Sequence, residues 1–259
     1  MCEDHREQHS EECKRWSDKL LHDKRLFTQP DRNHRGECPI CFLPMPLDAT
    51  KSTFMPCCGQ RICTGCGTAH VMSNVHDLVK AIRCVFCRTS PLDKVEYKKR
   101  KMERIEANDP AVLCHMGSEG YYKGDYDKAL KYFTIAADFG DAEAQFKLGK
   151  MYMVGEGVEI DEEKAVYHYE KTAIGGHAGA RYALAFVEAK NGNTERAVKH
   201  WIIAANLGCE YSMKRLLPMY KDGCITKEDY GATLRTHQAA IDATKSAQRD
   251  EAERTKHSG

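Results

Sequence analysis

Eight cysteines within fifty residues are the side chains whose spacing points most clearly to chemistry. Six of them form three C-x-x-C pairs and two are adjacent; the set is Cys38, Cys41, Cys57, Cys58, Cys63, Cys66, Cys84 and Cys87. A C-x-x-C turn brings two thiolates within bonding distance of one tetrahedral zinc ion. Eight sulfurs fit two zinc sites of four ligands each. Such closed sites stabilise structure and leave no open position for a substrate.

The spacing also indicates how the cysteines divide between two ions. Only four residues separate Cys58 from Cys63, which argues against two independent sites that follow one another along the chain. An interleaved arrangement is favoured instead. One ion would then be held by Cys38, Cys41, Cys63 and Cys66, and the other by Cys57, Cys58, Cys84 and Cys87.

The composition favours metal binding over disulfide bonds. The chain has 259 residues, 13 cysteines, 30% charged residues and a formal net charge of +1. Its first residues, MCEDHREQHS, have no apolar stretch like that of a signal peptide, and no run approaches the roughly 20 apolar residues of a membrane span. We therefore expect a soluble cytoplasmic or nuclear protein, where paired cysteines more often bind metal. The near-neutral charge predicts no general attraction to nucleic acid or membranes.

The segment CPICFLPMP…PCCGQRICTGC…CVFCRTSPL, within residues 36–93, resembles a RING finger. The resemblance implies a small zinc-bound cross-brace domain with two zinc ions. The sequence departs from the family where a histidine usually follows C-G, because Gln60 stands there. Binding by both Cys57 and Cys58 would restore four ligands, and His70 is the alternative ligand.

The resemblance also implies a surface that binds a ubiquitin-conjugating enzyme. Ile40, inside the first C-x-x-C pair, and Leu78, in a short helix, lie where the family presents apolar side chains. Arg88 directly follows the last ligand, where many RING ligases hold a basic residue that bridges the enzyme and ubiquitin. A planar guanidinium suits such a bridge because it donates several hydrogen bonds at once. The alternative is that these side chains only pack the zinc domain or face solvent.

Residues 109–245 show helical repeats. Three segments align, with Phe133, Tyr169 and Trp201 in equivalent places 36 and then 32 residues apart; they read KALKYFTIAADFG at 128–140, KAVYHYEKTAIGG at 164–176 and RAVKHWIIAANLG at 196–208. The elements L-G-x-x-Y, G-x-G-V, K-A and A-A-x-x-G within 142–177 resemble the SEL-like branch of the tetratricopeptide superfamily. We expect three repeats and a degenerate fourth, stacked into one core. Their surface would bind a protein substrate or adaptor.

Three charged segments complete the chain. Residues 1–35 and the basic linker at 94–108 are expected to be helical, and residues 246–259 form a charged tail. Nucleic acid is not expected as a partner, because the zinc domain and the basic linker lack the combined aromatic and basic pattern of nucleic-acid-binding surfaces. The predicted fold is mostly α, with the zinc-bound RING-like domain followed by an α-solenoid of helix-turn-helix repeats.

The leading functional hypothesis is a RING-type ubiquitin ligase. The zinc finger would recruit the conjugating enzyme and the repeats would bind the substrate or adaptor. No catalytic residue is assigned, because such a ligase accelerates transfer by positioning its partners. The alternative is a non-enzymatic, zinc-dependent scaffold for protein–protein interactions.

Overall fold

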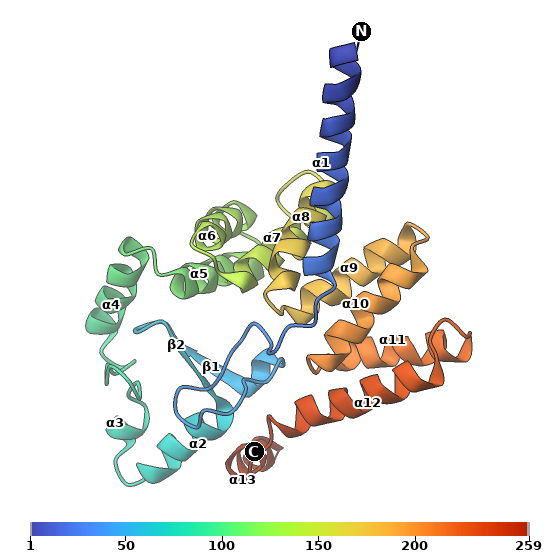
Figure 1. Cartoon of the computed structure of the whole chain (residues 1–259). Helices are drawn as coiled ribbons and strands as arrows, with labels where there is room; N and C mark the ends of the chain where they lie inside the picture. The colour runs from blue at the N-terminus through green and yellow to red at the C-terminus, as the bar shows by residue number, and fades with distance from the viewer. Residues whose placement is uncertain (1, 258–259) are drawn as a thin grey trace.

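Helices form most of the protein, as the sequence predicts (Figure 1). The computed structural model describes residues 2–257, with side chains from residue 14 to residue 255. A cysteine-rich segment with one small hairpin precedes a solenoid of helix pairs. The predicted solenoid of helical repeats is therefore confirmed.

The cysteine-rich half is built from short elements between two longer helices. In chain order they are α1 (Cys2–Leu26), the 3-10 helix η1 (Ala49–Lys51), β1 (Ser52–Met55), β2 (Gln60–Cys63), α2 (Thr64–Ser73), α3 (Leu78–Ala81) and α4 (Lys94–Glu106). Strands β1 and β2 pair antiparallel, with Ser52 opposite Cys63 and Met55 opposite Gln60. This hairpin places Cys57 and Cys58 in its turn and Cys63 at the end of β2.

The solenoid consists of four successive helix pairs followed by one terminal helix. The pairs are α5 (Pro110–Tyr122) with α6 (Tyr126–Asp138), α7 (Ala142–Val154) with α8 (Glu162–Ile174), α9 (Ala178–Lys190) with α10 (Thr194–Asn206), and α11 (Glu210–Lys221) with α12 (Lys227–Asp242); α13 (Ala247–His257) follows. Aspartates begin several of these helices, because their carboxylates accept hydrogen bonds from the free N–H groups of the first turn; examples are Asp109, Asp125, Asp141 and Asp161.

One large aromatic residue fills the core of each of the first three pairs. Phe133, Tyr169 and Trp201 are all buried, at 0%, 3% and 3% exposed. Gly117 and Gly149 lie against two of these rings: a Cβ atom on either glycine would come within 2.6 Å of the Phe133 or Tyr169 ring. The glycines therefore let the two helices of a pair approach each other closely.

The fourth pair, where the sequence predicts a degenerate repeat, differs from the first three in the buried residues of its second helix. In α12 the buried residues are Thr233 and His237, whereas Ala239 is exposed. His237 Nδ1 lies 2.8 Å from the carbonyl oxygen of Ala205 in α10. Helix α12 thus adds a polar contact with the preceding repeat, beside the apolar cluster in which Met213 and Leu216 of α11 pack with Trp201.

The N-terminal segment is bound to the repeats at the end of α1. Leu26 is fully buried among residues of the second and third pairs, and Phe27 packs beside it. The fully buried Arg181 of α9 donates hydrogen bonds to the carbonyl groups of Leu26 and Thr28. Asp23, one turn earlier, pairs with Arg196 of α10 at 3.0 Å. The first part of α1 projects from the body, with Trp16 exposed (Figure 1).

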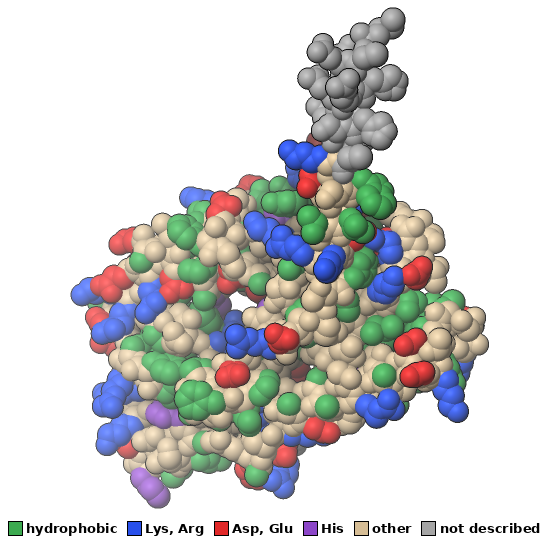
Figure 2. Space-filling view, viewed as in Figure 1, with side chains coloured by type: hydrophobic (Ala, Val, Ile, Leu, Met, Phe, Trp, Pro, Cys, Tyr) green, Lys and Arg blue, Asp and Glu red, His purple; other side chains and the backbone are tan. Residues whose placement is uncertain are grey.

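The linker predicted at 94–108 forms α4, and several of its basic side chains form ion pairs. Arg100 lies 2.7 Å from Glu96, and Lys101 lies 3.0 Å from Glu119 of α5. Basic and acidic side chains are both scattered over the face shown in Figure 2. In the part of the chain that the structure describes, no helix is long and apolar enough to span a membrane.

The segment predicted as a charged tail forms α13, and this helix contacts α2 of the cysteine-rich segment (Figure 1). Ala252 is fully buried, and Lys51 lies 2.6 Å from Glu253. Because α4 leads into the first repeat and α13 follows the last, both ends of the solenoid meet the cysteine-rich segment.

We predict that Gly149→Ala destabilises the protein although alanine favours helices. The added methyl group would collide with the Tyr169 ring, and overpacking of this kind costs about 1–3 kcal/mol. Gly231→Ala is the matched control, because the nearest atom outside its helix backbone lies 3.6 Å away, at the end of the Arg235 side chain. The control should keep or raise stability, since alanine favours the helix by up to about 1 kcal/mol. Urea unfolding measures both changes, and equal effects would contradict the close packing.

A second prediction concerns how folding stability depends on pH through His200. His200 is fully buried, and both ring nitrogens lack a hydrogen-bond partner. Burial, together with Arg181 and Arg196, lowers the pKa of His200 to about 3. The folded protein therefore keeps His200 neutral, while the unfolded chain protonates it below its ordinary value of about 6.5. The stability that His200 contributes is complete above that pH and is lost as the pH falls toward 3.

The free energy of unfolding lost through His200 is at most about 1.4 kcal/mol per pH unit. His200→Leu removes the titrating group, so urea unfolding should show a smaller loss of stability between pH 6.5 and pH 4.5 than wild type shows. An unchanged pH dependence in the variant would contradict this role for His200.

Candidate metal centre

The structure gathers the eight predicted cysteines into two groups of four. Cys38, Cys41, Cys63 and Cys66 form the first group, and Cys57, Cys58, Cys84 and Cys87 form the second. Within each group all sulfur atoms lie within 4.8 Å of one another. These groups have the same members as the two interleaved sites expected from the spacing.

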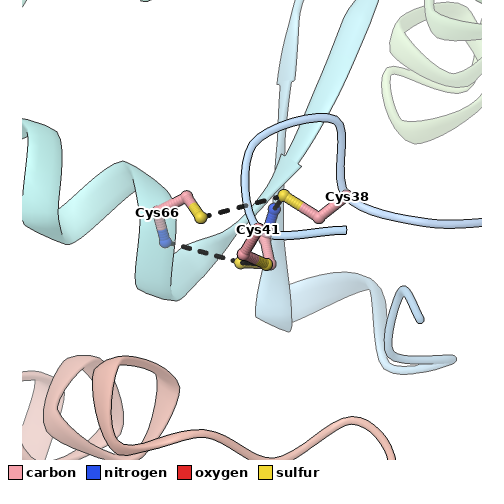
Figure 3. A group of neighbouring side chains, drawn as sticks. Cys38, Cys41 and Cys66 are labelled. Carbon is pink, nitrogen blue, oxygen red and sulfur yellow. Dashed lines mark hydrogen bonds between the residues drawn. The ribbon is translucent and has the colours of Figure 1, made fainter. Parts of the chain in front are cut away.

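The distances between sulfurs fit a tetrahedral zinc ion. Zinc–sulfur bonds of about 2.3 Å in a tetrahedron place the sulfurs about 3.8 Å apart, whereas a disulfide brings them to about 2.05 Å. In the first group the sulfurs of Cys38 and Cys66, and those of Cys41 and Cys63, lie 3.8 Å apart. In the second group the Cys58–Cys84 distance is 3.5 Å and the Cys57–Cys87 distance is 3.4 Å. Figure 3 shows Cys66 of α2 facing the loop that carries Cys38 and Cys41. Both donor sets therefore fit zinc, the first more closely.

The two C-x-x-C turns that begin and end the segment share one backbone geometry. The N–H group of Phe42 donates to Cys38 O at 2.8 Å, and the N–H group of Arg88 donates to Cys84 O at 2.9 Å. Phe42 and Arg88 have φ angles of 56° and 58°, a left-handed conformation that is rare for residues with side chains. The same uncommon turn around both pairs supports a metal-binding role for each.

The protein alone does not hold all four thiols of either group as thiolates, because the pKa values of some are lowered and those of others are raised. Burial opposes ionisation of Cys38, but backbone N–H groups, led by that of Cys63, lower its pKa to about 7. Burial raises the pKa of Cys58 to about 11 and raises that of Cys57 further. A bound cation would offset this effect, because metal ligation requires deprotonated sulfur.

The second group indicates which residue replaces the histidine that the RING family usually has as a ligand. Gln60 is exposed in β2, and its side chain belongs to neither group. Cys57 and Cys58 both belong to the second group, whereas His70 does not. The geometry thus favours the adjacent cysteines over His70 as the source of the fourth ligand.

A third cluster connects the residues just before the first cysteine with the helical repeats. His34 Nε2 and His177 Nε2 lie 3.5 Å and 3.4 Å from Glu143 Oε2, and the two imidazole rings stack with centroids 3.8 Å apart. Glu143 lies in the first turn of α7, and His177 precedes α9 as its N-cap. These residues form no recognisable sequence motif, and the repeat pattern did not reveal them.

Hydrogen bonding argues against a metal ion in this third cluster. His177 Nδ1 accepts a hydrogen bond from the backbone N–H of Ala180 at 3.1 Å. The neutral imidazole therefore carries its proton on Nε2, which faces Glu143 and has no free lone pair for a metal. Burial lowers the pKa of His177 to about 4, and the nearby imidazoles of His177 and His34 outweigh burial to lower the pKa of Glu143. At neutral pH the cluster is a carboxylate beside a neutral His177, and it serves as an internal contact.

The three residues expected to bind the conjugating enzyme are all accessible. Ile40 is 42% exposed and Leu78, the first residue of α3, is 74% exposed. Arg88 is also exposed, beside the last cysteine of the second group. Their role in binding stays a prediction.

We predict about two zinc ions per purified chain, measured by elemental analysis. Cys58→Ser should leave about one ion, because it removes a ligand of the second group. Cys224→Ser should keep two, since this exposed thiol lies outside both groups. A chelator should unfold residues 38–87 and leave the repeats helical, because structural zinc contributes about 10–16 kcal/mol to folding. One ion in wild type would contradict the second site.

Comparison with known proteins identifies the helical half. The family model for the Sel1 repeat matches residues 111–141, 142–177 and 180–209. A crystal structure of a Sel1 repeat protein from Oxalobacter formigenes superposes with a TM-score of 0.50 at 22% identity, covering 77% of this chain and 78% of that chain. At this identity the likeness shows the fold alone.

Curated relatives match a part of this chain. Chitin synthase regulatory factor 4 of Schizosaccharomyces pombe is 33% identical over 34% of this chain and 14% of its own length. An exopolysaccharide production negative regulator of Rhizobium meliloti is 36% identical over 28% of this chain and 27% of its own length. The chain thus spans only about a quarter or less of these relatives. The protein carries three Sel1 repeats, at residues 111–209.

Proposed function

We propose that the protein is a RING-type ubiquitin ligase whose Sel1 repeats bind the substrate or an adaptor. The observation that carries the proposal is the pair of interleaved four-sulfur groups, with an exposed arginine directly after the last cysteine. Zinc bound in these groups would supply structure. It would hold the turns and short helices that meet the conjugating enzyme.

The surface beside the second group supports docking of a protein. Large apolar side chains are exposed along α2, α3 and the loop between them: Val71 at 48%, Met72 at 55%, Val75 at 54%, Leu78 at 74% and Val79 at 48%. Contiguous exposed apolar residues are typical of interaction sites. Ile40 adds an apolar side chain from the first C-x-x-C turn. These residues would bind the conjugating enzyme mainly by burial of apolar area.

Arg88 would act on the ubiquitin carried by that enzyme. Arg88 directly follows Cys87 and itself has a left-handed backbone conformation, which is sterically unfavourable for a residue with a side chain. A glycine would adopt this turn without strain. An exposed arginine there is consistent with selection for its side chain, which can donate to two acceptors at once.

Transfer would proceed without a covalent intermediate on this chain. The zinc domain would hold the ubiquitin thioester of the conjugating enzyme in a reactive pose, and the repeats would bring a substrate lysine close. Holding both partners in place converts an encounter into an effectively intramolecular reaction. We place this activity in the cytoplasm or nucleus, where thiols stay reduced.

A non-enzymatic scaffold is the second candidate. Two observations favour it: Gln60 stands where the RING family usually has a histidine ligand, and two relatives that share the repeats are named for regulation. In this role the zinc domain and the repeats would each bind a protein without ubiquitin transfer.

The two functions predict different outcomes in a ubiquitin-discharge assay with a panel of charged conjugating enzymes. Arg88→Ala should slow discharge at least tenfold because it removes the bridging side chain. Its zinc content should stay the same, and its stability should change by no more than about 0.5 kcal/mol, as is usual at exposed positions. Arg83→Ala is the control, because Arg83 is an exposed arginine of the same loop.

Ile40→Ala and Leu78→Ala should instead weaken binding of the conjugating enzyme, measured by titration calorimetry. If wild type discharges no conjugating enzyme in the panel, the ligase proposal is wrong and the scaffold is favoured. Equal discharge by Arg88→Ala and Arg83→Ala would contradict the bridging role of Arg88 and leave the ligase proposal standing.

A further inference from the structure

The C-terminal helix α13 reaches the first cysteine group through a buried arginine. Arg249 is only 6% exposed, although it lies in a segment dominated by charged residues. Its Nη1 donates to Pro44 O at 2.8 Å, and its Nη2 donates to Leu43 O at 3.3 Å. Nη2 also lies 3.4 Å from the Cys41 sulfur. One guanidinium therefore contacts both the turn and a thiol of the first group.

The charge of Arg249 matches the charge that metal binding would create. A zinc ion with four thiolates is a negatively charged group, so a buried cation hydrogen-bonded to one sulfur stabilises it. Hydrogen-bond partners of this kind orient metal ligands and tune their affinity for the metal. Without that anion, the buried guanidinium would have fewer acceptors to offset its loss of hydration.

The backbone of α13 also fits closely against α2. A Cβ atom on Gly65 would lie 2.8 Å from Arg249 Cγ and 3.0 Å from the backbone N and Cα of Arg249. Only a residue without a side chain allows this approach without displacement of one helix. The Lys51–Glu253 ion pair, at 2.6 Å, adds a second contact between α13 and the cysteine-rich segment.

We propose that α13 acts as a clasp, a helix that docks on the cysteine-rich segment. Docking of α13 and metal binding by the first cysteine group stabilise each other. The zinc–thiolate anion holds Arg249, and Arg249 in turn strengthens the binding of zinc. This coupling is reciprocal by thermodynamic linkage. Loss of metal from the first group would release α13 and detach the end of the solenoid from the zinc domain. The inference requires zinc in the first group but does not depend on ligase activity.

The first test measures zinc retention in the full-length chain by native mass spectrometry during chelator titration. Arg249→Met keeps the aliphatic stem and removes the charge. It should lose one of the two ions at a chelator concentration about tenfold lower than wild type, as expected for loss of a ligand-orienting contact. Arg254→Met is the matched control on the same helix, where the side chain is 71% exposed and pairs with Glu251. The second ion should be retained as in wild type in both variants.

The second test separates docking from charge. Gly65→Ala leaves every charge in place but pushes α13 away, so one ion should again be lost more easily. At saturating zinc, hydrogen exchange in residues 247–257 should be faster in both Gly65→Ala and Arg249→Met than in wild type. Exchange in α10 is the internal control and should not change.

Three results would overturn the clasp. The first is equal zinc retention by Arg249→Met and Arg254→Met. The second is unchanged exchange of α13 in Gly65→Ala and Arg249→Met. The third is wild-type protein without zinc, which would remove the anion that the clasp requires.

Discussion

Backbone carbonyl groups at helix ends and in loops need hydrogen-bond donors, and two arginines meet this need on either side of the first cysteine turn. Arg181 of α9 donates to the carbonyls of Leu26 and Thr28, and Arg249 of α13 donates to those of Leu43 and Pro44. A buried carbonyl without a partner is unfavourable by about 1–3 kcal/mol. Because both arginines belong to helices that follow the cysteine-rich segment in the sequence, these bonds hold that segment against the solenoid.

This attachment matters for either proposed function. The cysteine-rich segment is connected to the first repeat through α4 and held after the last repeat by α13. The exposed apolar residues of α2 and α3 remain accessible, since α13 meets α2 at Gly65, in its first turn. A partner on the cysteine-rich segment and a partner on the repeats would therefore be held at a set separation. Such fixed geometry suits positioning catalysis and scaffolding alike.

Much of the fold follows from local patterns. The membership of both cysteine groups could be predicted because C-x-x-C spacing is typical of metal ligands, and the four residues between Cys58 and Cys63 argue against two sites in succession. The helix pairs could be predicted because Phe133, Tyr169 and Trp201 recur at repeat distance. The charged tail showed the limit of this reasoning: residues 246–259 have few apolar residues, yet α13 contacts the cysteine-rich segment and buries Ala252 and Arg249.

The sequence by itself determined the two groups of four thiols, the stacked helix pairs and the aromatic residue at the centre of each of the first three pairs. Only the tertiary structure showed the contacts of Arg181 and Arg249 and the cluster of His34, Glu143 and His177. The physical reason is the distance along the chain. Arg181 meets a carbonyl 155 residues earlier and Arg249 meets one 205 residues earlier. A single polar side chain that pairs over such a separation has no period and no neighbouring partner, so it becomes meaningful only once the chain has folded.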